Sequence, residues 1–174
     1  MCGPRTRTSP SSAIRISEPG SARPTVPSLW FSIVGRKKDI IITAGGKNIT
    51  PALIENDLKQ NRWISQAVMH GDRRPYPVIL VTLDPEEAPA LAEELGIEGS
   101  DPAALGEHPK VREHIGEIID QVNAHYAQVE QVKKFAILDH DLSQETGELT
   151  PTLKVKRNVV NEKYQGIFDS LYES

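Results

Sequence analysis

The chain has 174 residues, of which 38% are hydrophobic and 25% are charged, and its formal net charge at pH 7 is −4. This composition is ordinary for a soluble domain, and the small negative charge argues against a nucleic-acid-binding protein. The single cysteine, Cys2, excludes an intrachain disulfide and fits a reducing compartment. No apolar run approaches the length of about 18 residues that a membrane-spanning helix requires. We therefore expect a cytoplasmic protein without a transmembrane segment, with peripheral association at a membrane as the alternative.

The first 29 residues differ in composition from the rest of the chain. They are rich in serine, proline and arginine, Glu18 is their one acidic residue, and their apolar residues show no sustained periodicity. A segment of this kind buries too little apolar surface to offset the entropy of ordering it. It also lacks the continuous apolar core of a signal peptide. We expect residues 1–29 to be disordered and residues 30–174 to form one domain.

Two short strands are expected at the start of this domain, at residues 30–34 and 39–43. The β-branched run IIIT at 40–43 is typical of a buried strand, and the two strands would form a hairpin that turns through residues 36–38. The next residues, AGGKN at 44–48, form a loop in which Gly45 or Gly46 can take a positive φ and admit a ligand close to the backbone. Thr50 and Pro51 are the N-cap and first residue of a helix.

The remaining pattern alternates between helices and strands and predicts an α+β fold. We expect helices at residues 51–61, 85–95, 109–129 and 158–171, strands at 64–70, 77–83 and 133–138, and loops or short turns at 98–107 and 139–146. The run PVILVTL at 77–83 is apolar throughout, which predicts a central strand that is covered on both faces. The expected architecture is an N-terminal hairpin followed by a small mixed sheet flanked by three or four helices.

The basic cluster at residues 36–38 and the glycine loop lie at opposite ends of the same expected strand, an arrangement that suits a phosphate-bearing ligand. The same residues are also typical of a solvated sheet edge and a simple tight turn. The spacing of a Walker A loop is missing, and Lys47 is followed by Asn48. The histidines are scattered without the spacing of metal ligands, so we expect no metal site of the chain's own.

Two blocks resemble the small C-terminal domain of the adenylate-forming superfamily, and within it the bacterial long-chain fatty-acid–CoA ligases. The first is GRKKDIIITAGGKNI at residues 35–49, which resembles the signature that opens this domain. The second is GELTPTLKVKR at residues 147–157, which resembles the lysine motif near its end. The similarity runs from about residue 33 to residue 172. Two blocks in the correct order are far more specific than either block alone.

The resemblance implies that the chain is the C-terminal lid of an enzyme that forms fatty-acyl-CoA through an acyl-adenylate. The substrates would be a fatty acid, ATP with Mg²⁺, and CoA, and the products acyl-CoA, AMP and pyrophosphate. The large N-terminal adenylation domain, which carries the ATP and acyl sites in this family, would be the partner. We expect this chain alone to bind none of these ligands tightly and to be inactive.

The resemblance assigns the catalytic role to Lys154, which would contact the acyl carboxylate and the ATP phosphates during adenylation. A lysine suits this role because it is a compact cation that can stabilise developing negative charge. Lys156 is the alternative, since it lies two residues away on the same side of an extended segment. The commoner family motif has serine-glycine or threonine-glycine before the lysine, whereas this chain has Thr152 and Leu153, which we expect to stiffen the loop.

The resemblance also assigns roles at the start of the domain. Lys38 would be the hinge about which the lid rotates between the two half-reactions, and Arg36 would contact the nucleotide or stabilise the hinge. Gly45, Gly46, Lys47 and Asn48 would face the nucleotide and CoA in the second half-reaction.

Three hypotheses about the chain stay open at this point. It is an inactive piece of a ligase, or one chain of a split enzyme, or a stand-alone binding module that uses its basic hairpin edge for an anionic partner.

Overall fold

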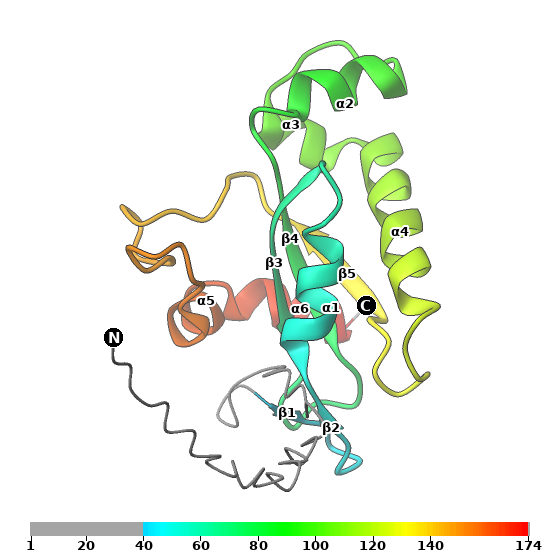
Figure 1. Ribbon diagram of the computed structural model, residues 1–174, viewed down its shortest axis with the longest axis vertical. Helices are drawn as coiled ribbons and strands as arrows, with labels where there is room; N and C mark the ends of the chain where they lie inside the picture. The colour runs from blue at the N-terminus through cyan, green and yellow to red at the C-terminus, as the bar shows by residue number, and fades with distance from the viewer. Residues whose placement is uncertain (1–39, 174) are drawn as a thin grey trace, which may run out of the picture. The chain divides into compact units, whose positions relative to one another are not determined.

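The computed structural model describes residues 40–173 (Figure 1). The expected strand at 30–34, the expected disorder at 1–29, and both Arg36 and Lys38 lie outside these described residues. The elements in chain order are β1 (Ile41–Ile42), β2 (Asn48–Ile49), α1 (Pro51–Leu58), β3 (Ile64–His70), β4 (Val78–Leu83), α2 (Ala88–Leu95), α3 (Pro102–Glu107), α4 (Pro109–Asn123), β5 (Lys134–Ile137), α5 (Arg157–Lys163) and α6 (Gln165–Glu173). Within residues 40–173, every helix is too short or too polar to cross a lipid bilayer.

The centre of the domain is a three-stranded mixed sheet with the order β3-β4-β5. β3 and β4 are antiparallel, with Ala67 opposite Val81, and β4 and β5 are parallel, with Ile79 opposite Phe135. All six residues of β4 are buried. The expected central strand, covered on both faces, and the expected mixed sheet are therefore confirmed.

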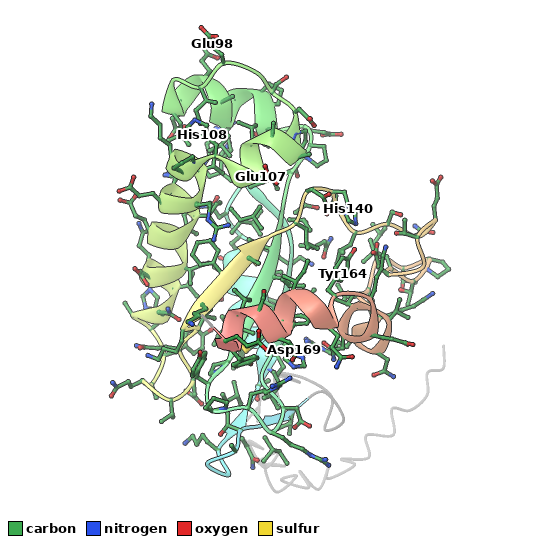
Figure 2. The ribbon with its side chains drawn as sticks, turned by 180° about the vertical axis from the view of Figure 1, so that it is seen from behind. Glu98, Glu107, His108, His140, Tyr164 and Asp169 are labelled. Atoms are coloured by element: carbon green, nitrogen blue, oxygen red, sulfur yellow. The ribbon has the colours of Figure 1, made fainter. Side chains whose placement is uncertain are left out.

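Two helical layers cover the two faces of this sheet, because successive side chains of a strand point to opposite sides. Ile79 and Val81 of β4 pack in one apolar cluster with side chains of α1 and α4. Val78 and Leu80 pack in a second cluster that includes Phe168 of α6. Figures 1 and 2 show α1 and α4 on one side of the sheet and α6 crossing the other. Each fully buried aliphatic side chain stabilises the fold by about 1.5–3 kcal/mol.

The N-terminal hairpin is formed by β1 and β2, in which Ile41 pairs with Ile49 and Ile42 with Asn48. The strand partner expected at residues 30–34 lies outside the described residues. The expectation that residues 40–43 are buried throughout is wrong, because Ile40 is 37% and Ile42 50% exposed. Only alternate side chains of this short ribbon can face the core, and these are Ile41 and Thr43.

Helix α1 begins as expected, with Thr50 as N-cap and Pro51 at the first helical position. The Thr50 side chain makes no capping hydrogen bond, so proline and packing define this start rather than the hydroxyl group. Ile49 precedes the N-cap and Ile54 is the fourth residue of the helix, the two positions of a hydrophobic staple. Both side chains are buried in the same apolar cluster. The helix ends at Leu58, earlier than expected.

Two further differences occur between β4 and α4. Residues 85–87 form a turn, and α2 begins at Ala88 rather than at residue 85. The Asp84 carboxylate accepts a hydrogen bond from the Glu86 amide and caps this turn. Residues 98–107, expected as loop or short turn, contain the six-residue helix α3. The Asp101 side chain accepts from the Ala103 amide and so caps this helix.

The expected extension of α4 to Val129 and the expected single C-terminal helix are both wrong. α4 ends at Asn123, whose side chain donates to the Val132 carbonyl at 3.0 Å and accepts from the Val132 amide at 2.9 Å. Val129 is 54% exposed. The C-terminal helix divides into α5 and α6 at Tyr164, which has φ −106° and ψ 18°.

We predict that Asn123→Ala lowers the free energy of unfolding by about 1–3 kcal/mol, because the buried amide and carbonyl of Val132 lose their partners. Urea denaturation measures this difference. Gln121→Ala, an exposed position on the same helix, is the control and should stay within about 0.5 kcal/mol of the parent chain. Equal stability of the two variants would contradict the proposed role of Asn123 in ending α4.

Candidate functional site

The lysine motif forms a closed turn at residues 149–156, which we call the lysine loop. Leu149 and Val155 form an antiparallel bridge at its base. Within it, the Thr150 amide donates to the Lys154 carbonyl at 2.8 Å, and the Lys154 amide donates to the Thr150 hydroxyl oxygen at 3.0 Å. The Lys156 amide donates to the Glu148 carbonyl at 2.7 Å. The backbone of Lys154 is therefore held on both sides by hydrogen bonds.

Leu153 has a left-handed backbone conformation with φ +57°, and it is 62% exposed. An L-residue in this conformation costs about 1–2 kcal/mol, whereas glycine adopts it freely. This is the position at which the resembled motif commonly carries glycine. The backbone of the lysine loop thus has a glycine-like shape although the sequence has leucine, and the expected stiffness of the loop stays a prediction.

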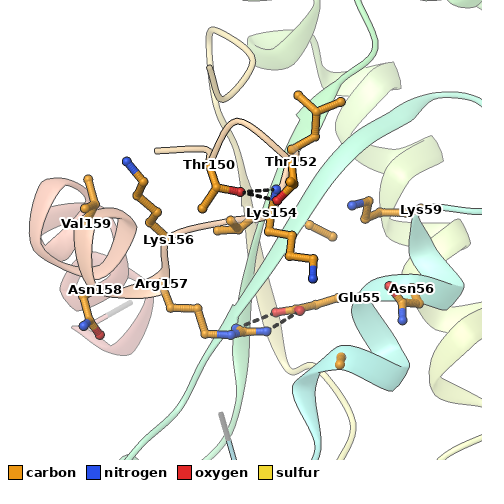
Figure 3. Close-up of a pocket in the computed structure, with 14 residues that line it drawn as sticks. Glu55, Asn56, Lys59, Thr150, Thr152, Lys154, Lys156, Arg157, Asn158 and Val159 are labelled. Atoms are coloured by element: carbon orange, nitrogen blue, oxygen red, sulfur yellow. Dashed lines mark hydrogen bonds and ion pairs between the residues drawn. The ribbon is translucent and has the colours of Figure 1, made fainter. Parts of the chain in front are cut away.

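A groove of about 930 Å³ lies between α1 and the lysine loop (Figure 3). Its lining includes Glu55, Asn56, Lys59, Thr150, Lys154 and Lys156. In Figure 3 the Lys154 side chain points from the loop toward α1, whereas the Lys156 side chain points away from α1. Val155 between them bridges to Leu149, yet the two lysine side chains point in different directions, so the expectation that they share one side is not met.

The groove is electropositive because its acidic residue already has cationic and amide partners. Glu55 of α1 accepts two hydrogen bonds from the Arg157 guanidinium, at 2.8 and 2.5 Å, and one from the Met69 amide at 2.7 Å. The side chains of Glu55 and Arg157 are 10% and 23% exposed. Within residues 40–173, no carboxylate forms an ion pair with Lys154 or Lys156. The groove can therefore attract an anion such as a phosphate.

Glu148 lies directly before the lysine loop and is completely buried. One carboxylate oxygen accepts from the Ser143 amide at 3.1 Å and the Thr146 hydroxyl at 2.5 Å. The other accepts from the Lys163 ammonium and the Tyr164 hydroxyl, both at 2.5 Å. Burial by itself raises the pKa of Glu148, but the bonds from Lys163, Thr146, Tyr164 and Ser143 outweigh it and lower the pKa to about 2.

A histidine extends this network toward the surface. The Nε2 atom of His140 lies 2.8 Å from the Tyr164 hydroxyl oxygen, and Nδ1 lies 2.5 Å from the Asp139 carboxylate. Figure 2 shows His140, on the segment after β5, close to Tyr164 at the junction of α5 and α6. Burial raises the pKa of Tyr164, and its bond to Glu148 raises that pKa further, so the phenol stays protonated as a donor.

The glycine loop lies at the exposed tip of the β1–β2 hairpin. The Thr43 hydroxyl oxygen accepts from the Lys47 amide at 3.2 Å, and Gly46 has φ +75°. A Cβ atom on Gly45 would approach only the Thr43 hydroxyl oxygen, at 4.0 Å, so the described part of the domain does not itself require glycine there. Neither these residues nor Asn48 line the groove with Lys154, and the two surfaces are separate.

Sequence analysis missed the acidic residues that organise the lysine loop. Glu55 and Glu148 sit in polar contexts that resemble solvated positions, and their partners lie far along the chain or on another element. Arg157, noted only as part of a basic motif, uses its charge on Glu55. Among residues 40–173, no cluster of three histidine, cysteine or acidic residues could hold a metal ion.

We predict that Glu148→Gln is less stable than the parent chain by up to about 3 kcal/mol at neutral pH, since a pKa difference of one unit corresponds to about 1.4 kcal/mol. The folded-state pKa of about 2 is below the ordinary value of 4.5, so this contribution is present above about pH 5 and is lost as the pH falls toward 2. Denaturant unfolding from pH 7 to pH 2 should show the two stabilities converging. The exposed Glu145→Gln is the control, and a difference that does not change with pH would refute the assignment.

Comparison with known proteins identifies the family. The family model of the AMP-binding enzyme C-terminal domain matches residues 38–174. The chain is 40% identical over 144 residues to the long-chain-fatty-acid–CoA ligase FadD15 of Mycobacterium tuberculosis, covering 82% of this chain and 24% of that protein. It is 38% identical over 162 residues to the human long-chain-fatty-acid–CoA ligase ACSBG1, covering 83% of this chain and 22% of that protein. The chain thus spans about a quarter of the length of these curated relatives.

Solved structures agree on the fold. The A domain of carboxylic acid reductase from Segniliparus rugosus superposes with a TM-score of 0.64 at 19% identity, over 80% of this chain and 20% of that one. The adenylation domain of the carboxylate reductase from Mycobacterium chelonae superposes with a TM-score of 0.64 at 21% identity, over 81% of this chain and 20% of that one. At these identities the likeness establishes the fold alone. Together with the family match, it shows that this chain belongs to the family of AMP-binding enzyme C-terminal domains.

Proposed function

We propose that this chain is the mobile lid of a long-chain fatty-acid–CoA ligase, and that Lys154 is its adenylation lysine. The supporting observation is the placement of Lys154, which extends from a hydrogen-bonded turn into an electropositive groove and has no acidic partner among the described residues. The relatives with 38–40% identity carry the name of this activity. The catalytic partner is a large N-terminal adenylation domain that holds ATP with Mg²⁺ and the fatty acid.

In the first half-reaction, a carboxylate oxygen of the fatty acid attacks the α-phosphorus of ATP and pyrophosphate leaves. Negative charge accumulates on the α-phosphate and on the leaving group, and a cation fixed beside them lowers the barrier. Lys154 supplies this cation when the lid closes. Its ammonium group requires no displacement of an internal acid, since Glu55 is already bound by Arg157.

Lys154 is favoured over Lys156 on two grounds. Leu153 has the backbone conformation of glycine, and the resembled motif carries glycine directly before its lysine, which aligns Lys154 with that lysine. The Lys154 side chain also points toward α1 and the groove, whereas the Lys156 side chain points away from α1 (Figure 3).

In the second half-reaction, the lid rotates and presents a different surface, and the CoA thiol attacks the acyl-adenylate with loss of AMP. The separate hairpin surface with Gly45, Gly46, Lys47 and Asn48 is the candidate for this step. The hinge is assigned to Lys38 with support from Arg36, on the resemblance alone. The alternative of a binding module that uses the basic hairpin edge stays a prediction, since that edge lies outside the described residues.

We predict that this chain alone releases no pyrophosphate from ATP with palmitate and CoA, and that it restores adenylation when mixed with the large domain of a long-chain acyl-CoA synthetase that lacks its own lid. Lys154→Ala should reduce the restored rate by about 100- to 1,000-fold, the usual loss when one charge-stabilising group is removed. Lys156→Ala and the control Lys133→Ala should keep most of the restored adenylation rate. Restoration that depends on Lys156 instead would overturn the assignment.

We further predict that Gly45→Leu slows acyl-CoA formation from preformed acyl-adenylate and leaves pyrophosphate release unchanged. The reason is that a Cβ on Gly45 would have no neighbour closer than 4.0 Å among residues 40–173, whereas Gly45 lies on the surface assigned to the CoA half-reaction. Gly166→Leu, at another exposed glycine with open space around it, is the matched control. Equal slowing of both half-reactions by Gly45→Leu would argue against a separate hairpin surface for the second step.

A further inference from the structure

We infer that Glu148 is a positioning residue for Lys154: its buried carboxylate fixes the base of the lysine loop and thereby sets where the Lys154 ammonium lies during adenylation. This inference rests on the proposed role of Lys154. Glu148 itself touches no substrate, because it is completely buried and its two oxygens are occupied by four donors of the chain.

The first step of the argument is that the Glu148 side chain joins separate segments. Ser143 and Thr146 belong to the loop before it, whereas Lys163 and Tyr164 belong to the end of α5 and its junction with α6. Tyr164 also packs in the second apolar cluster with Leu149. The carboxylate is therefore fixed to the helical layer that covers one face of the sheet.

The second step is that the main chain of Glu148 forms the base of the lysine loop. Its carbonyl accepts the Lys156 amide at 2.7 Å, and the adjacent Leu149 bridges to Val155. Both ends of the loop thus meet at the residue whose side chain is fixed. Residues 151–154 at the tip are all exposed, and the bonds of Lys154 and Leu153 to Thr150 stay within the lysine loop, so the base is what attaches the loop to the rest of the domain.

The third step is that these contacts require a carboxylate rather than merely a polar group. All four partners of Glu148 donate, and an ionised carboxylate is the side chain that accepts from all of them. Glutamine offers one accepting oxygen and an NH₂ group, which would face two of the donors. Lys163 would then lose its counter-charge, and the base of the loop would lose half of its fixed bonds.

The decisive experiment measures the two half-reactions with the chain and the lidless large domain. Glu148→Gln should reduce kcat for adenylation at least tenfold and leave acyl-CoA formation from preformed acyl-adenylate unchanged, because Lys154 acts in the first half-reaction alone. In the Lys154→Ala background, Glu148→Gln should cause no further loss, since it acts through that lysine. Exposed Glu145→Gln is the matched control. Equal loss in both half-reactions, or losses that multiply in the double variant, would overturn the inference.

A second measurement needs only this chain. By amide hydrogen exchange, Glu148→Gln should speed exchange at Thr150 and Lys156 at least tenfold relative to the buried strand residue Leu80. Unchanged relative protection at Thr150 and Lys156 would overturn the inference, whatever the result of the activity assay. Failure of the wild-type chain to restore adenylation would count against the proposed function alone. If Glu148→Gln does not fold, Tyr164→Phe removes one donor, keeps the ring, and should cause a smaller change of the same kind at Thr150 and Lys156.

Discussion

The burial of β4 on both faces is the constraint from which the rest of the domain follows. A three-stranded sheet with an apolar central strand needs a helical layer on each side. One layer, α1 with α4, is formed by helices that precede β5 in the chain, and the other, α5 with α6, by helices that follow it. The segment between β5 and α5 must therefore connect the sheet to the second layer. The lysine loop is the last part of that connection, so its location follows from the packing of the core.

The edge of the sheet explains how this loop meets α1. β3 is an edge strand, and an edge strand exposes backbone groups that lack partners from a neighbouring strand. Glu55 accepts from the Met69 amide, and Arg157 donates to the Met69 carbonyl at 3.4 Å. The Glu55–Arg157 pair thus covers part of this edge and attaches the start of α5 to α1. The groove beside it arises because two elements approach the same edge strand.

Patterns of neighbouring residues were sufficient to predict the strands and helices whose type is decided by their own sequence. The apolar run of β4 predicted its type and its burial, and a helix was expected from residue 109, where α4 begins. Helix ends were not predicted where a distant partner decides them, as with Asn123 and Val132. The lysine motif could be recognised by resemblance, but the groove could not be foreseen, because Glu55 and Arg157 are 102 residues apart. The network around Glu148 was missed because it joins the loop before this residue to the end of α5, and no motif links the two.

The two buried acids also determine which cations remain available to a ligand. Arg157 and Lys163 pair with the buried acids Glu55 and Glu148, and salt screens such partly buried ion pairs less than exposed ones. Lys154 is exposed and has no carboxylate partner in the described part of the chain. Added salt should therefore weaken the attraction of Lys154 for a phosphate before it loosens the loop that carries the lysine. Under the proposed function, these ion pairs set the position of the lysine loop, and the exposed Lys154 provides the interaction that forms and breaks as the lid opens and closes.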